Sequence, residues 1–156
     1  MALSPEVTRT IPNGAQPLPG VATGGQPTPD QLAQLRDAGV KVVVDLRDPM
    51  EQRAFDEPAA ARELGLEYIN VPVRPGATSD DQLAKVREAL RNADERPVFV
   101  HCATANRVGG ALIPHLMLDQ NMTEEEAMEC AMRVGLRSPE YLEWGLGYAK
   151  RAAGDG

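Results

Sequence analysis

Short β-branched runs alternate along this chain with segments that carry helix signals, and this alternation constrains the fold more than any other feature. The runs occupy residues 21–23, 41–46, 67–73 and 97–100. The helical segments occupy residues 28–39, 51–64 and 79–92, and further helices begin near residues 106, 123 and 138. Strands that alternate with helices form mostly parallel sheets covered on both faces. The sequence therefore predicts an α/β fold in which helices flank a mostly parallel central sheet of four or five strands.

Capping residues mark the helix starts. Thr28 and Ser79 each stand three positions before a glutamine, which completes a capping box. Glycines follow several of the segments, as is typical of helix ends. The segment 51–64 is the least regular, because Pro58 interrupts it.

The length of 156 residues fits one domain with a full hydrophobic core. Residues 1–20 contain four prolines and little periodicity. We therefore expect an extended N-terminal arm over residues 1–20, followed by a single domain over residues 21–153.

The charge balance argues against a nucleic-acid-binding protein, because the net charge is −7 and such proteins need a basic face. No apolar run approaches the roughly 18 residues of a membrane span, and the start lacks a signal-peptide pattern. Two cysteines make no disulfide framework, so we expect a cytoplasmic protein. Two histidines without ligand spacing predict no metal site.

The segment VFVHCATANRVGG at residues 98–110 carries the candidate chemistry. It is typical of a strand, a tight loop and a helix, with Cys102 between the strand and the helix. Unpaired backbone N–H groups and the helix dipole favour a thiolate there, as does a guanidinium from Arg107. The loop amides can also converge on an anion. A lone cysteine is more often a buried core residue, and Cys130, in the middle of a predicted helix, fits that interpretation.

This segment resembles the His-Cys…Arg signature of the cysteine-dependent protein phosphatases. The resemblance is greatest to the bacterial phosphatase-like domain of the beta-lactamase-hydrolase-like family and to dual-specificity-phosphatase-like proteins near it. Three more segments share it: GGQPTP at residues 24–29, VVVDLR at residues 42–47 and YINVPV at residues 68–73. The resemblance covers about residues 20–140 and implies a protein-tyrosine-phosphatase-like fold.

The resemblance also implies roles for individual residues. Cys102 would be the nucleophile, Arg107 would bind the oxyanions, and His101 would tune the thiolate from the strand side. The resemblance implies no metal or organic cofactor, and a phosphorylated or other small anionic substrate. Anion-binding amides would come from Ala103, Thr104, Ala105 and Asn106, and Gln26, Arg47 and Asp48 would lie near the mouth of the site.

Two departures from the phosphatase pattern keep other functions open. Four residues separate Cys102 from Arg107 where phosphatases usually have five, and rhodanese-type sulfurtransferases use the shorter loop. Ala105 also stands where a glycine is common, which strains a positive φ. No carboxylate stands at the expected place for a general acid, in Arg74-Pro75-Gly76. Asp80 and Asp81 follow shortly after, although acids also suit a helix start.

The leading prediction is hydrolysis of a phosphate monoester through a phosphocysteine on Cys102. The first alternative is sulfur transfer through a Cys102 persulfide. The second alternative is an inactive anion-binding module. The missing acid and the absent loop glycine favour it, and the presence of both Cys102 and Arg107 opposes it.

Overall fold

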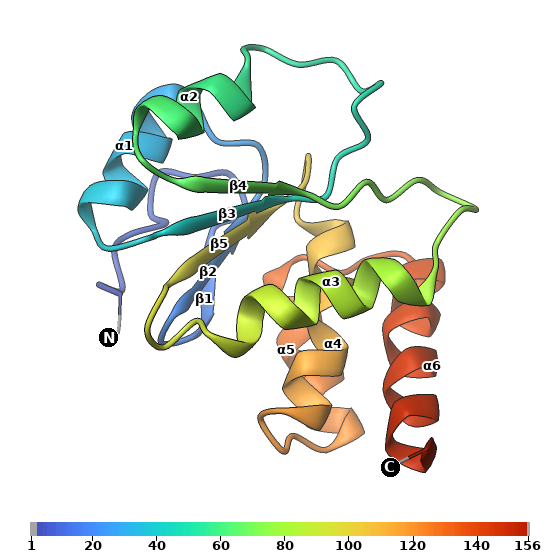
Figure 1. Cartoon of the computed structure of the whole chain (residues 1–156). Coiled ribbons are helices and arrows are strands. Elements are labelled where there is room, and N and C mark those ends of the chain that lie inside the picture. Colours follow the sequence, from blue (N-terminus) through green and yellow to red (C-terminus); the bar gives the residue numbers. More distant parts are fainter. Residues whose placement is uncertain (1–2, 156) are drawn as a thin grey trace.

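A computed structural model of the chain describes residues 3–155. The strands in this part are β1 (Ala15–Leu18), β2 (Val21–Gly24), β3 (Val42–Asp45), β4 (Glu67–Asn70) and β5 (Val98–His101). The helices are α1 (Pro29–Asp37), α2 (Glu57–Glu63), α3 (Asp80–Arg91), α4 (Asn106–Leu118), α5 (Glu124–Val134) and α6 (Pro139–Asp155). Figure 1 shows α1 and α2 on one face of the sheet and the other four helices on the opposite face.

The five strands form one sheet in the order β1-β2-β5-β3-β4. All neighbours are parallel except β1 and β2, which pair antiparallel. The predicted α/β fold with a mostly parallel sheet is thereby confirmed. The register aligns Gly24 and Asp45 with His101, so three strands end at the same edge of the sheet.

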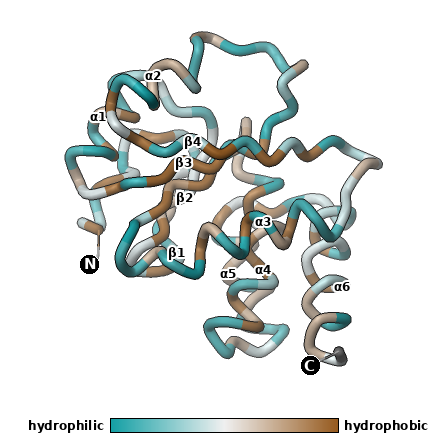
Figure 2. Tube along the Cα trace, viewed as in Figure 1, coloured by the Kyte–Doolittle hydropathy of each residue, from teal (hydrophilic) through white to brown (hydrophobic). Residues whose placement is uncertain are grey.

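The core divides into two clusters because successive strand residues face opposite sides of the sheet. Val98 and Val100 face α3 to α6, whereas Phe99 faces α1 and its buried leucines. A sheet covered on both faces requires strands that are hydrophobic throughout. Figure 2 shows this, with hydrophobic residues gathered along the central strands.

Residues 3–20 do not form the extended arm that the prolines suggest. They contain several turns and then β1, which extends the sheet beside β2. Leu3 and Ile11 are buried in the cluster that contains Phe99. This segment is therefore part of the folded domain.

The predicted helix over residues 51–64 is also only partly right, because α2 covers Glu57–Glu63 alone. Asp56 caps it, with a side chain that accepts a hydrogen bond from the Ala59 N–H. Pro58 lies in the first turn, where its missing N–H costs nothing. Residues 51–56 are left as a loop that reaches the end of the sheet.

Among the described residues, no helix has the length and apolar character needed to cross a bilayer.

Candidate active site

A pocket of about 700 Å³ opens at the carboxyl ends of the parallel strands. Sites in parallel α/β sheets form at this edge, where loops from neighbouring strands converge. Its lining comes from the loop after β3 (Asp48, Met50, Glu51), the loop after β4 (Arg74, Pro75), the segment after β5 (Thr104, Asn106, Arg107) and α6 (Tyr141).

Arg107 lines this pocket, and the thiol of Cys102 lies close to its guanidinium. Cys102 directly follows β5 and is fully buried, and Arg107 lies in the first turn of α4. Burial lowers the pKa of Arg107, but the hydrogen bond with Glu51 and the nearby Cys102 outweigh burial and raise it overall. The guanidinium therefore stays charged beside the thiol.

Glu51 holds the guanidinium of Arg107 from one side. The two carboxylate oxygens accept from Arg107 at 2.7 and 3.0 Å, a bidentate arrangement that fixes the plane of the guanidinium. A third hydrogen bond, of 3.1 Å, runs from Arg107 to the carbonyl of Val73. Sequence analysis missed Glu51 because its segment was interpreted as helix.

Three successive carbonyl groups, those of residues 102–104, are held from outside the loop. Nδ1 of His101 lies 3.2 Å from the first carbonyl oxygen. The backbone N–H of Gln26 donates to the second at 3.2 Å, and the side-chain amide of Asn13 donates to the third at 3.1 Å. Partners from three separate segments thus turn these carbonyls outward.

The outward carbonyls determine where the loop N–H groups point. In a trans peptide the C=O and N–H point in opposite directions, and the described chain has no cis peptide. The N–H groups of residues 103–105 therefore point inward, and no acceptor among the described residues binds them. Such converging, unpaired N–H groups at a helix N-terminus make a concave anion site.

Ala105 completes the loop in the left-handed region, with φ of 73°. This is the positive φ expected from the sequence, and it costs roughly 1–2 kcal/mol in a residue other than glycine. Gly135 packs against this turn, because a Cβ there would lie 2.9 Å from the Cβ of Ala105. The side chain of Asn106 also binds the 137–138 backbone and the hydroxyl of Ser138. The segment between α5 and α6 thus holds the strained turn in place.

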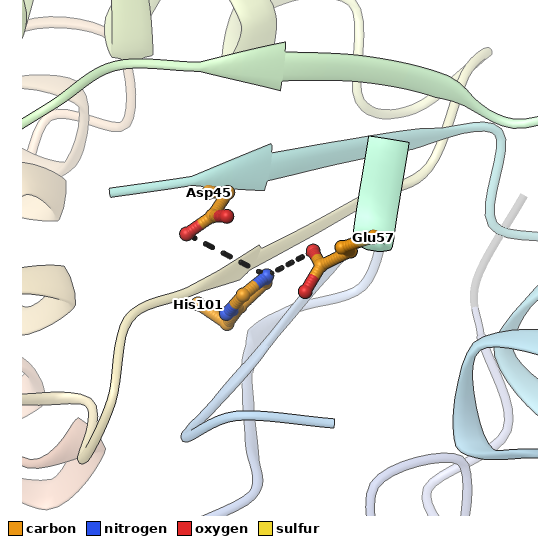
Figure 3. A group of neighbouring side chains, drawn as sticks. All are labelled: Asp45, Glu57 and His101. Carbon is orange, nitrogen blue, oxygen red and sulfur yellow. Dashed lines mark hydrogen bonds and ion pairs between the residues drawn. The ribbon is translucent and has the colours of Figure 1, made fainter. Parts of the chain in front are cut away.

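A buried charged cluster lies beneath the loop. Figure 3 shows Asp45 at the end of β3, Glu57 at the start of α2 and His101 at the end of β5, all pointing toward one another. Nε2 of His101 lies 2.5 Å from Glu57 Oε2 and 3.9 Å from Asp45 Oδ1. The three side chains are fully buried.

Asp45, Glu57 and His101 have the donor atoms of a metal site, since one ligand atom from each lies within 4.8 Å of the others. However, the Arg47 guanidinium already binds both carboxylates, at 3.1 Å from Asp45 and 3.3 Å from Glu57. Burial raises the pKa of Asp45, but the hydrogen bond from Arg47 and the charge of His101 more than reverse this. The cluster is therefore an ion-pair network, in which Arg47 supplies the positive charge that a cation would bring.

The predicted residues at the mouth of the site are only partly found there. Asp48 lines the pocket, where its ion pair with Arg74 lowers its pKa. Arg47 and Gln26 instead lie below the loop, where both donate to Glu57. Tyr141, in the first turn of α6, also lines the pocket, although the sequence did not single it out.

Asp80, the candidate general acid, does not line the pocket. Asp80 begins α3, and its exposed carboxylate accepts a 2.6 Å hydrogen bond from Arg151 of α6. This position favours the other role considered for Asp80, that of an acid at a helix N-terminus.

We expect Asp80→Asn and Asp81→Asn to leave turnover unchanged for both an aryl phosphate and an alkyl phosphate. A general acid contributes on the order of 10²- to 10⁴-fold, and it matters most for a poor leaving group such as an alkoxide. Steady-state kinetics on both substrates checks this. A selective loss on the alkyl phosphate would return the acid role to the mutated residue.

Comparisons with known proteins identify the family of this chain. The family model described as "DSP-PTPase phosphatase fused to NAD+ Kinase" matches residues 17–140. Among curated proteins, no match was found.

Solved structures share the fold. A putative phosphatase (DUF442) from Shewanella putrefaciens CN-32 has a TM-score of 0.80 at 23% identity, covering 95% of this chain and 98% of that one. PTPMT1 in complex with PI(5)P has a TM-score of 0.79 at 19% identity, covering 91% of this chain and 97% of that one. A cysteine-to-serine variant of TpbA of P. aeruginosa in complex with pTyr has a TM-score of 0.65 at 20% identity, covering 96% of this chain and 94% of that one.

Proposed function

The chain belongs to the DSP-PTPase family of phosphatases fused to NAD+ kinase, and from this premise we propose that it hydrolyses phosphate monoesters through a phosphocysteine on Cys102. The observation that carries the proposal is the loop itself. The N–H groups of residues 103–105, which directly follow Cys102, have no acceptor among the described residues, and the guanidinium of Arg107 lies close to the Cys102 thiol. A nucleophile beside a preformed oxyanion site suits attack on phosphorus.

The reaction proceeds in two displacements. The Cys102 thiolate attacks phosphorus, a P–S bond forms, and the bond to the ester oxygen breaks as that oxygen leaves. The loop N–H groups and Arg107 bind the three other oxygens, whose charge they stabilise in the transition state. Water then attacks the phosphocysteine, which releases inorganic phosphate and restores the thiolate.

Water is the proton source for the leaving group in this proposal. Asp48 and Glu51 line the pocket, but hydrogen bonds from Arg74 and Arg107 respectively lower the pKa of each carboxyl. Both are therefore ionised near neutral pH and hold no proton to donate. Substrates whose leaving groups need little protonation should react fastest.

The size and lining of the pocket favour a small phosphorylated substrate. A pocket of about 700 Å³ accommodates a phosphorylated aromatic ring or a sugar phosphate, with Tyr141 as an aromatic wall. Structural neighbours hold pTyr and PI(5)P, which both carry a phosphate monoester group. NAD+ kinases produce NADP+, whose 2′-phosphate is also a monoester, so the family description adds NADP+ to the substrates to test.

One observation favours sulfur transfer as a second candidate function. Only residues 103–106 separate Cys102 from Arg107, and this length is typical of rhodanese-type loops. A Cys102 persulfide would use the same inward N–H groups.

We expect the protein to release phosphate from an aryl phosphate faster than it forms thiocyanate from thiosulfate and cyanide. The family assignment favours the first reaction, and both assays should use the same preparation with Cys102→Ser as control. Thiocyanate production that depends on Cys102, without phosphate release, would assign sulfur transfer instead. Absence of both activities would leave only an anion-binding role, detectable by titration with inorganic phosphate.

A further inference from the structure

The charged cluster beneath the Cys102 loop is unused in the mechanism above, although it touches the backbone of the nucleophile. Nδ1 of His101 contacts the carbonyl of Cys102 on one side. Nε2 contacts Glu57 on the other side, as Figure 3 shows. The cluster is sealed from solvent, since Glu57 and His101 are both fully buried. The contacts of these two side chains determine where their protons lie.

Both ring nitrogens of His101 face hydrogen-bond acceptors. Nδ1 is 3.2 Å from the carbonyl oxygen of Cys102, which can only accept. Nε2 is 2.5 Å from Oε2 of Glu57. A proton must therefore lie on Nδ1, and a second proton must lie between Nε2 and the Glu57 carboxylate.

The surroundings of Glu57 place the second proton on the histidine. Its other oxygen, Oε1, accepts from Gln26 Nε2 at 2.9 Å and from Arg47 at 3.3 Å. Two donors on the far oxygen, one of them a guanidinium, stabilise the ionised carboxylate. Glu57 is then an anion, and His101 is an imidazolium.

Charged partners surround both buried carboxylates of the network. Asp45 pairs with Arg47 and with the partly exposed Arg53, and the Tyr68 hydroxyl donates to it. Glu57 pairs with Arg47 at 3.3 Å, and a contact of 2.5 Å joins it to Nε2 of His101. A charged His101 gives Glu57 a second cation at hydrogen-bonding distance in the interior, where an incompletely paired carboxylate is costly.

We propose that Glu57 is a positioning residue that keeps His101 doubly protonated beneath the nucleophile. The imidazolium then acts on Cys102 in two ways. Its Nδ1–H fixes the Cys102 carbonyl, and so directs the next N–H into the anion site. Its charge also stabilises the neighbouring thiolate.

The protonation state can be read by NMR, because the chain has only two histidines. In ¹⁵N-histidine-labelled protein at neutral pH, we expect two protonated ring nitrogens for His101. Burial lowers the pKa of His115, so its ring should be neutral and give an internal contrast. His115→Gln assigns the signals.

Glu57→Gln removes the charge with little change of volume, and we expect it to convert His101 to a neutral ring. Glu57→Asp keeps the carboxylate and should retain the imidazolium. Glu63→Gln is the matched control, since Glu63 is an exposed residue of the same helix. If Glu57→Gln does not fold, the spectra of the wild-type protein and of Glu57→Asp still decide the protonation state.

The kinetic part of the inference rests on the proposed function. We expect Glu57→Gln to lower kcat/KM for an aryl phosphate on the order of tenfold or more. We also expect the acidic limb of the pH profile of kcat/KM to move to higher pH. Glu57→Asp should restore both in part. If Glu57 had only a structural role, Glu57→Gln would lower the melting temperature of the protein and leave the acidic limb of its pH profile unchanged.

The possible failures are distinguishable. A neutral His101 in the wild-type protein, or an imidazolium that persists in Glu57→Gln, would overturn the inference. A neutral ring in Glu57→Gln with an unchanged pH profile would also refute the positioning role. A wild-type protein with the expected spectra but no phosphatase activity would refute the proposed function alone.

Discussion

Cys102→Ser should abolish turnover of an aryl phosphate while the protein remains folded. A hydroxyl is almost entirely protonated at neutral pH and is a far weaker nucleophile than a thiolate, so we expect a loss on the order of 10⁴-fold or more. Serine is close in size to cysteine, so the packing at this buried position should change little. Release of inorganic phosphate measures turnover, and thermal unfolding monitored by circular dichroism checks the fold.

Cys130→Ala is the control for this substitution. Cys130 is buried in α5, where burial raises the pKa of its thiol. It does not line the pocket, and its loss should leave turnover intact. Retained turnover in Cys102→Ser would exclude the phosphocysteine, and with it the proposed mechanism.

Arg107→Lys should lower kcat for the aryl phosphate on the order of 10²- to 10³-fold, with a smaller change in KM. The guanidinium binds Glu51 with two nitrogens and also lies close to Cys102, whereas an ammonium cannot match that planar geometry. An interaction that strengthens as charge develops on the oxyanion affects kcat more than KM.

Arg87→Lys is the matched control for the change at Arg107. Arg87 also makes a bidentate ion pair, with Asp119 at 2.7 and 2.8 Å, but it does not line the pocket. The Arg87→Lys variant should lose some stability and keep its turnover of the aryl phosphate. Near-normal turnover in Arg107→Lys would contradict the oxyanion-binding role.

Patterns within single segments predicted most of the architecture. The run at residues 41–46 is hydrophobic throughout because β3 is buried on both faces. Thr28 and Ser79 make the capping boxes that their spacing indicates. The pattern of a strand, a tight loop and a helix likewise indicated that Cys102 and Arg107 lie close together, because the short loop limits their separation.

Contacts between distant segments could not be predicted in this way. Glu51 and Glu57 lie in a stretch whose composition favours a helix, so nothing indicated that one would bind Arg107 and the other His101. Asn13 binds the carbonyl of Thr104 across 91 positions of sequence. Such pairings depend on tertiary packing, which no local pattern encodes.

The contact from Asn13 helps to decide which residues a functional fragment of this protein must include. The span matched by the family model, residues 17–140, begins after Asn13 and ends just before Tyr141. Yet Asn13 orients one loop carbonyl, and Tyr141 forms a wall of the pocket. A fragment restricted to residues 17–140 would keep Cys102. It would lose Asn13, which orders the loop, and Tyr141, which lines the pocket. Tyr141 is therefore a natural position at which to alter substrate selectivity, and it lies outside the span that the family model matches.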